Sequence, residues 1–325
     1  MSSPVTLVIG SHGLLGSALA AAVERRGRGQ MFVQTVRWND ERHVHQDLVA
    51  GLDRLVRAAD GGPWRVAWCA GVGVTSTSRS DLGNEVDALR RFLEAIAERH
   101  ASSSTGRGAV FLASSAGGVY AGSAEPPFTE STTPRPISPY GEAKLEAERA
   151  VHELCPPAGV SALIGRISNL YGPGQDLRKP QGLITHLCRA RITGQPTSVY
   201  VSLDTLRDYV FVRDCAEMIL DGLDRLDRHR LERSDPDVGP VVTKILASQR
   251  SVSIGSLLME TRRIFRRPPR VLIAASPFAS TQTRDLRLRS VVWPELDRRV
   301  LTPLPVGIRA TAADIEMRLL AGARV

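Results

Sequence analysis

Short apolar runs alternate with amphipathic segments along the first half of the chain. The apolar runs have the length of strands that are buried on both faces. They cover residues 5–10, 31–37, 64–71, 108–117 and 160–172. The intervening segments repeat apolar residues at helical spacing and cover residues 14–27, 47–59, 84–100 and 138–155. This alternation predicts a doubly wound α/β fold with a parallel sheet covered by helices on both faces.

The pattern becomes less regular after residue 172, which indicates a second, smaller domain. A loop leads into predicted helices at 183–194, 251–265 and 304–322, and a strand enters a helix within 208–226. We therefore assign residues 1–171 to the sheet domain, with 205–228 returning to it. We assign residues 172–204 and 229–325 to a mixed α/β cap that binds the substrate.

Three glycines lie between the first predicted strand and the first predicted helix, with the spacing G-x-x-G-x-x-G. Gly10 permits a tight turn, Gly13 lets the backbone approach a pyrophosphate, and Gly16 lets the helix pack closely on the strand. A glycine triplet by itself also fits an ordinary turn, but this context predicts a Rossmann-type dinucleotide site. The loop residues expected to line the cofactor are Gly10, His12, Gly13, Leu14, Leu15 and Gly16.

The end of the second predicted strand bears on the choice of cofactor. A carboxylate there would bind the ribose 2′-hydroxyl of NAD, whereas Arg37 suits the 2′-phosphate of NADP. We therefore predict NADP(H), with NAD(H) as the alternative if Arg37 only stacks on adenine. Asp47 and Leu48 are expected at the adenine edge, and Ala70 and Gly71 where the backbone passes the cofactor.

The segment "SPYGEAK" contains a lysine in a chain that otherwise uses arginine. Only three of its 42 basic residues are lysines. Lys144 follows Tyr140 by four residues, so both side chains lie on one face of a helix that Ser138 and Pro139 begin. A free phenol titrates near ~10, and a neighbouring ammonium favours its ionised form. Tyr140 is therefore predicted to exchange a proton with the substrate, while Lys144 also binds the nicotinamide ribose.

A hydroxyl at the end of the strand over residues 108–117 completes the predicted catalytic set. Ser115 lies 25 positions before Tyr140 and is expected to hydrogen-bond the reacting oxygen. Ser114 is the alternative, because the register of the two serines is not evident from the pattern. A serine at a strand end otherwise acts as a turn former.

Composition narrows the possible partners. The net charge is +8, but the arginines are scattered and aromatic residues make up 5% of the chain, so we expect no nucleic-acid partner. The four cysteines form no CxxC pair, which predicts a reducing compartment and no metal site. The N-terminal apolar run is too short to cross a bilayer, so we expect no membrane partner and a cytoplasmic protein.

Taken together, the motifs resemble those of the extended short-chain dehydrogenases/reductases of the nucleotide-sugar epimerase/dehydratase type. The matching stretches are "GSHGLLG", "SSAGGVY", "SPYGEAK", "RISNLYGPG", "RDYVFVRD" and "PLPVGIRAT". The resemblance implies a Rossmann sheet and a C-terminal cap that holds a nucleoside-diphosphate sugar. It also implies a homodimer formed through the helices that contain residues 85–96 and 140–151.

The resemblance assigns roles to further residues. Ile167 and Ser168 would line the nicotinamide, while Asn169 and Arg207 would contact the substrate. Near the end of the chain, Gln282 or Arg284 would contact the nucleotide. One departure is Glu85, where the family usually has asparagine.

The reaction follows from which catalytic groups the motifs contain. "SSAGGVY" has no acidic pair for a dehydratase, and neither it nor "KPQGLI" has the cysteine and histidine of a 3,5-epimerase. These absences leave reduction of a 4-keto sugar or 4-epimerisation through a transient ketone. Because Arg37 favours NADP, which a reductase exchanges at each turnover, we predict reduction of a 4-keto-6-deoxyhexose at C4, with Tyr140 as proton donor. The alternatives are a 4-epimerase with tightly bound NAD and a protein that senses NADP without turnover. A nucleic-acid binder is the weaker alternative.

Overall fold

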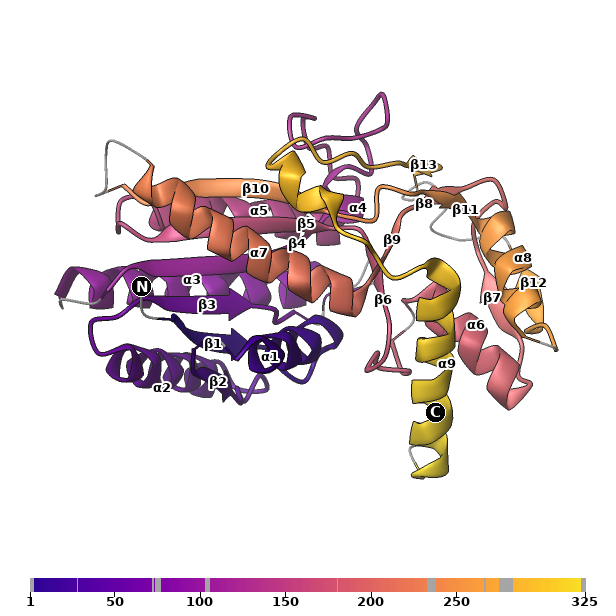
Figure 1. Cartoon of the computed structure of the whole chain (residues 1–325), viewed down its shortest axis with the longest axis horizontal. Helices are drawn as coiled ribbons and strands as arrows, with labels where there is room; N and C mark the ends of the chain where they lie inside the picture. The colour runs from indigo at the N-terminus through magenta and orange to yellow at the C-terminus, as the bar shows by residue number, and fades with distance from the viewer. Residues whose placement is uncertain are drawn as a thin grey trace.

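The computed structural model describes residues 3–27, 29–71, 73, 77–102, 106–179, 181–232, 238–265, 267–274 and 283–322. Its main element is a six-stranded parallel sheet with the strand order β10-β5-β4-β3-β1-β2 (Figure 1). The strands are β1 (Val5–Ile9), β2 (Met31–Gln34), β3 (Trp64–Trp68), β4 (Gly108–Ser115), β5 (Ser161–Ile167) and β10 (Val241–Leu246). This arrangement confirms the predicted α/β fold.

Helices cover both faces of the sheet because alternate strand residues point to opposite sides. One face packs on α2 (Glu41–Ala59), α3 (Arg79–Ser102) and α5 (Pro139–Leu154). The other face packs on α1 (Leu14–Arg26) and α7 (Val212–Leu231). In β4, for example, Val110 and Leu112 belong to the first core, and Ala109 and Phe111 belong to the second.

The cap has a hydrophobic core of its own. Three helices form it: α6 (Leu183–Thr193), α8 (Ile254–Ile264) and α9 (Leu304–Leu320). Short strand pairs connect the cap to the sheet, with the pairings β11-β8-β13, β12-β7 and β6-β9. These strands are β6 (Asn169–Tyr171), β7 (Thr197–Val199), β8 (Leu206–Arg207), β9 (Tyr209–Phe211), β11 (Val252–Ser253), β12 (Val271–Ile273) and β13 (Asp285–Leu286). Two short helices complete the fold, α4 (Ala116–Val119) and the 3₁₀ helix η2 (Pro294–Arg298).

The sheet extends further along the chain than the sequence pattern indicated. β10 lies within residues 229–325, which we assigned to the cap, yet it pairs with β5 from Val241↔Ala162 to Leu246↔Ile167. Lys244 interrupts its apolar run, which hid the strand. Its Nζ is buried and donates to Ser290 Oγ, to the Val292 carbonyl and to Asp297 Oδ2. Near residue 205, strand β8 pairs with β11 and β13 before the chain continues into β9 and α7.

Two helices begin earlier than their apolar periodicity predicted. α2 begins at Glu41 because the Asp40 side chain accepts hydrogen bonds from the backbone N–H groups of Arg42 and His43. α3 begins at Arg79, so its first turns overlie the cavity described below. These added turns are polar, which is why hydrophobic spacing did not reveal them.

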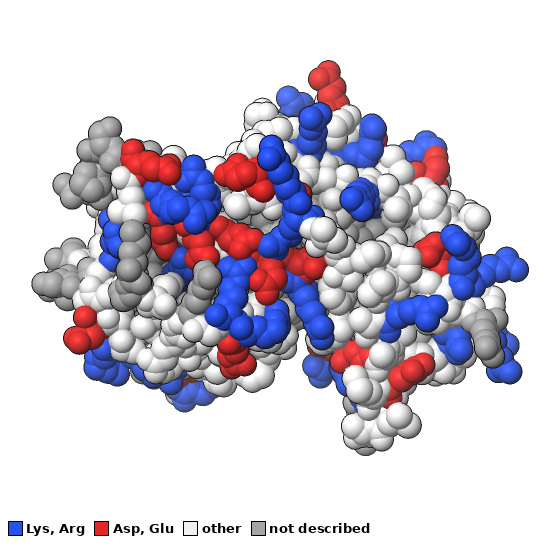
Figure 2. Space-filling model, in the orientation of Figure 1, with Lys and Arg blue, Asp and Glu red and all other residues white. Residues whose placement is uncertain are grey.

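Charges of both signs are mixed on the surface shown in Figure 2. Acidic residues of α7 pair with arginines of neighbouring elements; Arg26 contacts Glu217 and Asp221, and Arg65 contacts Asp224. This face therefore presents ion-pair networks rather than a continuous basic track. Within the described residues, no helix combines the length and apolarity needed to span a membrane.

Candidate active site

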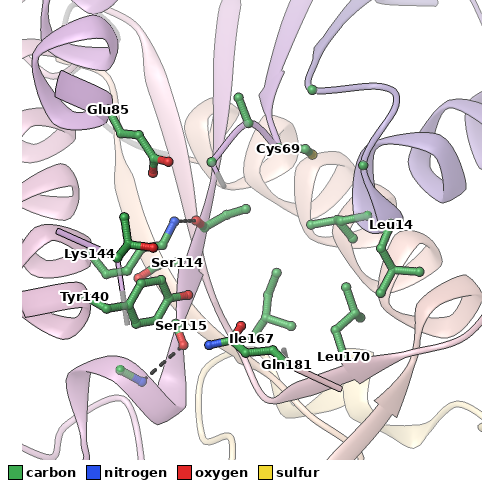
Figure 3. Close-up of a pocket in the computed structure, with 18 of the residues that line it drawn as sticks. Leu14, Cys69, Glu85, Ser114, Ser115, Tyr140, Lys144, Ile167, Leu170 and Gln181 are labelled. Atoms are coloured by element: carbon green, nitrogen blue, oxygen red, sulfur yellow. Dashed lines mark hydrogen bonds between the residues drawn. The ribbon is translucent and has the colours of Figure 1, made fainter. Parts of the chain in front are cut away.

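A cavity of about 1730 Å³ opens where the sheet strands end and the cap begins (Figure 3). Its walls come from the loops after β1, β3, β4 and β5, from α5 and from the cap. Ligands of open parallel sheets bind at this carboxyl edge. In the described part of the chain, no group of three or more His, Cys, Asp or Glu side chains could hold a metal ion.

The glycine loop is shaped by close backbone contacts. Gly10 has φ of 85°, and a β-carbon there would lie 2.6 Å from the Ala70 backbone nitrogen. A β-carbon at Gly16 would lie 2.2 Å from the Gly10 carbonyl oxygen, so only glycine lets α1 begin this close to β1. The cavity is lined by Gly10, His12, Gly13, Leu14 and Leu15, whereas Gly16 lies beneath the loop.

Arg37 and Asp47 bind each other instead of facing the cavity. Arg37 Nε donates to Asp47 Oδ2 at 2.9 Å and its Nη2 donates to Oδ1 at 2.7 Å. These hydrogen bonds lower the pKa of Asp47 to about 2. Neither residue is among those that line the cavity, whereas Leu48 is, together with Gln34 and Thr35 at the end of β2. The pairing could not be inferred from the strand pattern, because it joins residues ten positions apart across a loop.

The loop after β3 brings backbone and an acidic side chain to the cavity. Ala70 and Gly71 line it as expected, and Gly71 has φ of 137°. Glu85 of α3 accepts a hydrogen bond from the Gly73 N–H through Oε1 at 2.9 Å. A β-carbon at Gly71 would lie 3.3 Å from Glu85 Oε2 and 3.6 Å from Lys144 Nζ. The carboxylate therefore reaches the same end of the cavity as the lysine (Figure 3).

Tyr140 and Lys144 project from the start of α5 into the cavity. Ser138 caps the helix by accepting from the Gly141 N–H at 3.2 Å. Lys144 Nζ lies 5.7 Å from the centre of the Tyr140 ring and donates to the Ala113 carbonyl at 3.4 Å. Both predicted catalytic side chains of α5 are thus brought together.

Helix α4 fixes the position of the tyrosine ring. A β-carbon at Gly118 would lie 3.1 Å from Tyr140 Cε1, and one at Gly141 would lie 2.2 Å from the Gly118 carbonyl oxygen. The two glycines therefore let α4 pack directly on the first turn of α5. The serines of the "SSAGG" stretch therefore end strand β4, and Gly118 within it allows α4 to pack on α5.

The two serines at the end of β4 have different surroundings. Ser114 is buried, and its Oγ is 2.5 Å from Glu148 Oε1. Ser115 accepts from the Gly118 N–H at 3.1 Å, which leaves its own proton available, and the Tyr140 hydroxyl turns toward it (Figure 3). The geometry therefore favours Ser115 over Ser114 as the hydroxyl that faces a substrate.

A buried charged network lies behind these serines. Arg166 of β5 donates to Glu148 of α5 through Nε at 3.0 Å and through Nη2 at 2.6 Å. Its Nη1 donates to the Tyr120 hydroxyl at 2.6 Å, and Tyr120 in turn donates to the Thr129 carbonyl. The network joins β4, α4, α5 and β5 directly beneath the catalytic set, which the sequence motifs did not indicate.

The strand end after β5 supplies three of the predicted residues. Ile167, Ser168 and Asn169 all line the cavity. The Asn169 side chain is held by a 2.8 Å hydrogen bond to the Asp208 carbonyl. Ser168 Oγ is buried and has no hydrogen-bond partner among the described residues, so it can receive a polar group of a bound cofactor.

Of the two arginines predicted to bind substrate, Arg207 faces the cavity and Arg284 does not. Burial lowers the pKa of Arg207, whose Nη1 donates to the Leu206 carbonyl at 2.9 Å. Arg284 is exposed and forms an ion pair with Asp204, outside the cavity lining. Gln282 lies outside the described residues. The guanidinium of Arg284 is thus bound by a surface carboxylate and lies apart from the cavity that Arg207 faces.

The cap contributes lining residues that the motifs did not single out. They are Lys179, Gln181, Tyr200, Tyr209 and Thr283. Tyr200 follows β7 and is half exposed, so its ring is available for stacking. The sequence offers no signal for Tyr200 beyond an aromatic residue that follows the short segment Thr197–Val199.

Comparison with known proteins identifies related sequences. The sequence profile of the NAD-dependent epimerase/dehydratase family matches residues 6–232. An uncharacterized UDP-glucose epimerase of Bacillus subtilis is 28% identical over 149 residues, which are 43% of this chain and 44% of that protein. A dTDP-4-dehydro-6-deoxyglucose reductase of Escherichia coli is 29% identical over 115 residues, 35% of this chain and 36% of that protein. The chain thus spans less than half the length of either curated relative.

Solved structures share the fold over nearly the whole chain. UDP-glucose 4-epimerase of Brucella ovis in complex with NAD aligns with a TM-score of 0.75 at 19% identity, covering 96% of this chain and 98% of that one. The complex of Thermus thermophilus UDP-glucose 4-epimerase with NAD aligns with a TM-score of 0.72 at 20% identity, covering 96% and 99%. At this identity the likeness establishes the fold.

Proposed function

The chain belongs to the NAD-dependent epimerase/dehydratase family, and on that premise we propose that it reduces a nucleoside-diphosphate 4-keto-6-deoxyhexose at C4, using NADPH. The observation that carries the proposal is the catalytic set Ser115, Tyr140 and Lys144 at one end of the cavity. The "SSAGG" segment beside this set contains neither an acidic pair nor a cysteine. Such a set serves hydride chemistry with one proton transfer.

The cavity has features that fit a dinucleotide. Gly10 forms a cradle that any β-carbon would fill, and α1 directs its N-terminus at it. Ser168 holds a buried hydroxyl without a partner among the described residues, which suits the polar amide of a nicotinamide. When bound, the reduced cofactor supplies the hydride.

The chain's own residues handle the proton. Tyr140 would donate its phenolic proton to the carbonyl oxygen as that oxygen gains negative charge. Ser115 would donate its hydroxyl proton to the same oxygen, since its own oxygen accepts from the Gly118 N–H and its proton remains to donate. Lys144 places a positive charge beside the phenol, which stabilises the phenolate left after the transfer.

The preference for NADPH rests on the end of β2. The residues that line the cavity there, Gln34 and Thr35, carry no carboxylate to bind a ribose 2′-hydroxyl or repel a 2′-phosphate. The charge of Asp47 is compensated by Arg37, and the imidazole of His12, in the glycine loop, lines the cavity as a hydrogen-bonding group. The epimerase structures named above bind NAD, so NAD(H) is the alternative cofactor.

The nucleotide part of the substrate would bind in the cap. Arg207 is a largely buried guanidinium that donates to a backbone carbonyl, so a diphosphate would give it the anionic partner that burial favours. Tyr200 and Tyr209 also line the cavity and offer aromatic surface to a nucleotide. The B. subtilis and E. coli relatives are named for nucleotide-linked hexoses, which supports this class of substrate.

The test mixes purified protein with NADPH or NADH and a panel of nucleoside-diphosphate 4-keto-6-deoxyhexoses. We expect loss of NADPH absorbance with one member of the panel and none with Tyr140→Phe. Conversion of UDP-glucose to its 4-epimer without added cofactor would overturn the proposal in favour of the epimerase. Tight NADP binding with no turnover of any substrate would instead favour a sensor.

A further inference from the structure

Glu85 brings a negative charge to the end of the cavity that holds Tyr140 and Lys144. It comes from the second turn of α3, is half-buried and lines the cavity. Its Oε1 atom accepts a 2.9 Å hydrogen bond from the Gly73 N–H, which fixes the side chain. The proton transfer described above uses Ser115, Tyr140 and Lys144, and it leaves this carboxylate without a role.

Two glycines show how close the Glu85 carboxylate lies to the catalytic side chains. A β-carbon at Gly71 would lie 3.3 Å from Glu85 Oε2 and 3.6 Å from Lys144 Nζ. A β-carbon at Gly73 would lie 3.3 Å from Glu85 Oε2 and 3.6 Å from Tyr140 Cδ2. The glycines therefore keep side chains out of the space between the carboxylate, the ammonium and the phenol ring (Figure 3).

The ammonium of Lys144 has no counter-charge in direct contact. Among the described residues, no carboxylate is close enough to Lys144 Nζ to form an ion pair, and this atom donates to the Ala113 carbonyl at 3.4 Å. Glu85 therefore acts on the ammonium through the space beside Gly71. Charges at such a separation still interact, because a half-buried site has a lower effective dielectric constant than water.

We propose that Glu85 stabilises the oxidised, positively charged nicotinamide and so makes the bound reduced cofactor a stronger hydride donor. This inference rests on the nicotinamide site of the proposed function, which Tyr140 and Lys144 adjoin. The hydride, with its electron pair, leaves the neutral reduced ring for the carbonyl carbon, and the carbonyl oxygen takes the proton of Tyr140. The ring thereby becomes a cation, which the ammonium of Lys144 opposes and the carboxylate of Glu85 favours.

Binding affinities report this effect directly. A carboxylate that stabilises the cationic ring binds the oxidised cofactor more tightly than the reduced one. Thermodynamic linkage ties that difference in affinity to the hydride-donating strength of the bound cofactor. One carboxylate that acts across a partly wetted cavity should change the ratio of the two dissociation constants by about fivefold.

A purely structural role for Glu85 makes a different prediction. The hydrogen bond from the Gly73 N–H to Glu85 holds the loop after β3 against α3, and losing it would weaken both forms of the cofactor by the same factor. Glutamine can accept the same hydrogen bond through its side-chain oxygen. Glu85→Gln therefore removes the charge while it retains the contact.

The test titrates the purified protein with NADP⁺ and with NADPH by isothermal calorimetry at neutral pH and low ionic strength. For Glu85→Gln, the dissociation constant of NADP⁺ should rise about fivefold, while that of NADPH should change less than about twofold. The titrations are repeated with NAD⁺ and NADH, because both cofactors carry the same ring. Glu94→Gln is the matched control, since Glu94 is exposed on the same helix and outside the cavity lining, and it should leave the ratio unchanged.

Lys144→Met tests the opposite sign. Loss of the ammonium should weaken both forms of the cofactor but shift the ratio toward the oxidised form. The double variant with Glu85→Gln should return the ratio to within about twofold of the wild type. If Glu85→Gln leaves the ratio unchanged, or both single variants shift it in the same direction, the inference is wrong. A wild-type protein that binds neither cofactor would overturn the nicotinamide site of the proposed function, and this inference with it.

Discussion

Replacing Arg166 by methionine should lower the free energy of unfolding by about 3–5 kcal/mol. The arginine side chain is 8% exposed and its partner Glu148 is 4% exposed, so water stabilises neither charge and each charge depends on the other. Methionine keeps much of the volume and removes the charge. It leaves the Glu148 carboxylate buried with Ser114 as a partner but without a counter-charge.

The magnitude follows from what loses a partner. Glu148 loses the donors that bind it from Nε and Nη2, and the Tyr120 hydroxyl loses the donor from Nη1. A loss of about 3–5 kcal/mol is a large fraction of the roughly 5–15 kcal/mol that stabilises a typical folded domain. With a urea m-value of about 3 kcal/mol/M, the unfolding midpoint should fall by about 1 M or more.

Urea unfolding followed by tryptophan fluorescence measures the effect. The double variant Arg166→Met with Glu148→Leu should be more stable than Arg166→Met alone, because it removes the orphaned charge. Arg178→Met, which breaks an exposed pair with Asp176, is the control and should leave the unfolding midpoint nearly unchanged. If Arg166→Met unfolds within about 1 kcal/mol of the wild type, or the double variant is no more stable than it, the network does not brace the site as argued.

Further outcomes are expected at Lys144, at the two serines and at Arg37. Lys144→Arg should lower kcat about 100-fold while the fold persists, measured by steady-state kinetics and circular dichroism, because the guanidinium is broader than the ammonium. Ser115→Ala should lower kcat about 100-fold, whereas Ser114→Ala should mainly lower stability, by about 1–3 kcal/mol in urea unfolding. Arg37→Ala should raise the KM for NADPH more than that for NADH, because it leaves the Asp47 carboxylate uncompensated. Arg37 lowers the folded-state pKa of Asp47 to about 2, so the ionised Asp47 stabilises the folded protein above about pH 4, and this stabilisation is lost as the pH falls toward 2. When unfolding stability is measured against pH, Arg37→Ala should lack that acid-side loss.

Local patterns in the sequence predicted most of the fold and, in the candidate site, the glycine loop and the pairing of Tyr140 with Lys144. Alternating apolar runs and helical periodicity predicted the parallel sheet, because a strand buried on both faces must be apolar throughout. The spacing of Gly10, Gly13 and Gly16 predicted the cofactor loop, since a β-carbon would clash at Gly10 and Gly16. Tyr140 and Lys144 could be paired from sequence because one helical turn separates them.

Tertiary structure decided the features that depend on distant partners. Both serines line the cavity, and what distinguishes them is Glu148, 34 residues beyond Ser114, which binds the Ser114 hydroxyl. Period-two alternation along the strand could not reveal that partner. Arg37 could not be assigned from its strand position because Asp47 binds its guanidinium.

The edge strand β10 shows the same limit for the fold. Lys244 interrupts an apolar run in the sequence, and only folding places its partners, Ser290 and Asp297, around it. A buried charge is recognisable only with its counter-charge, and the sequence places that counter-charge 53 residues away. Short spacings along the chain predict local geometry. Charge compensation and burial depend on which distant segments come into contact, and only the tertiary structure decides that.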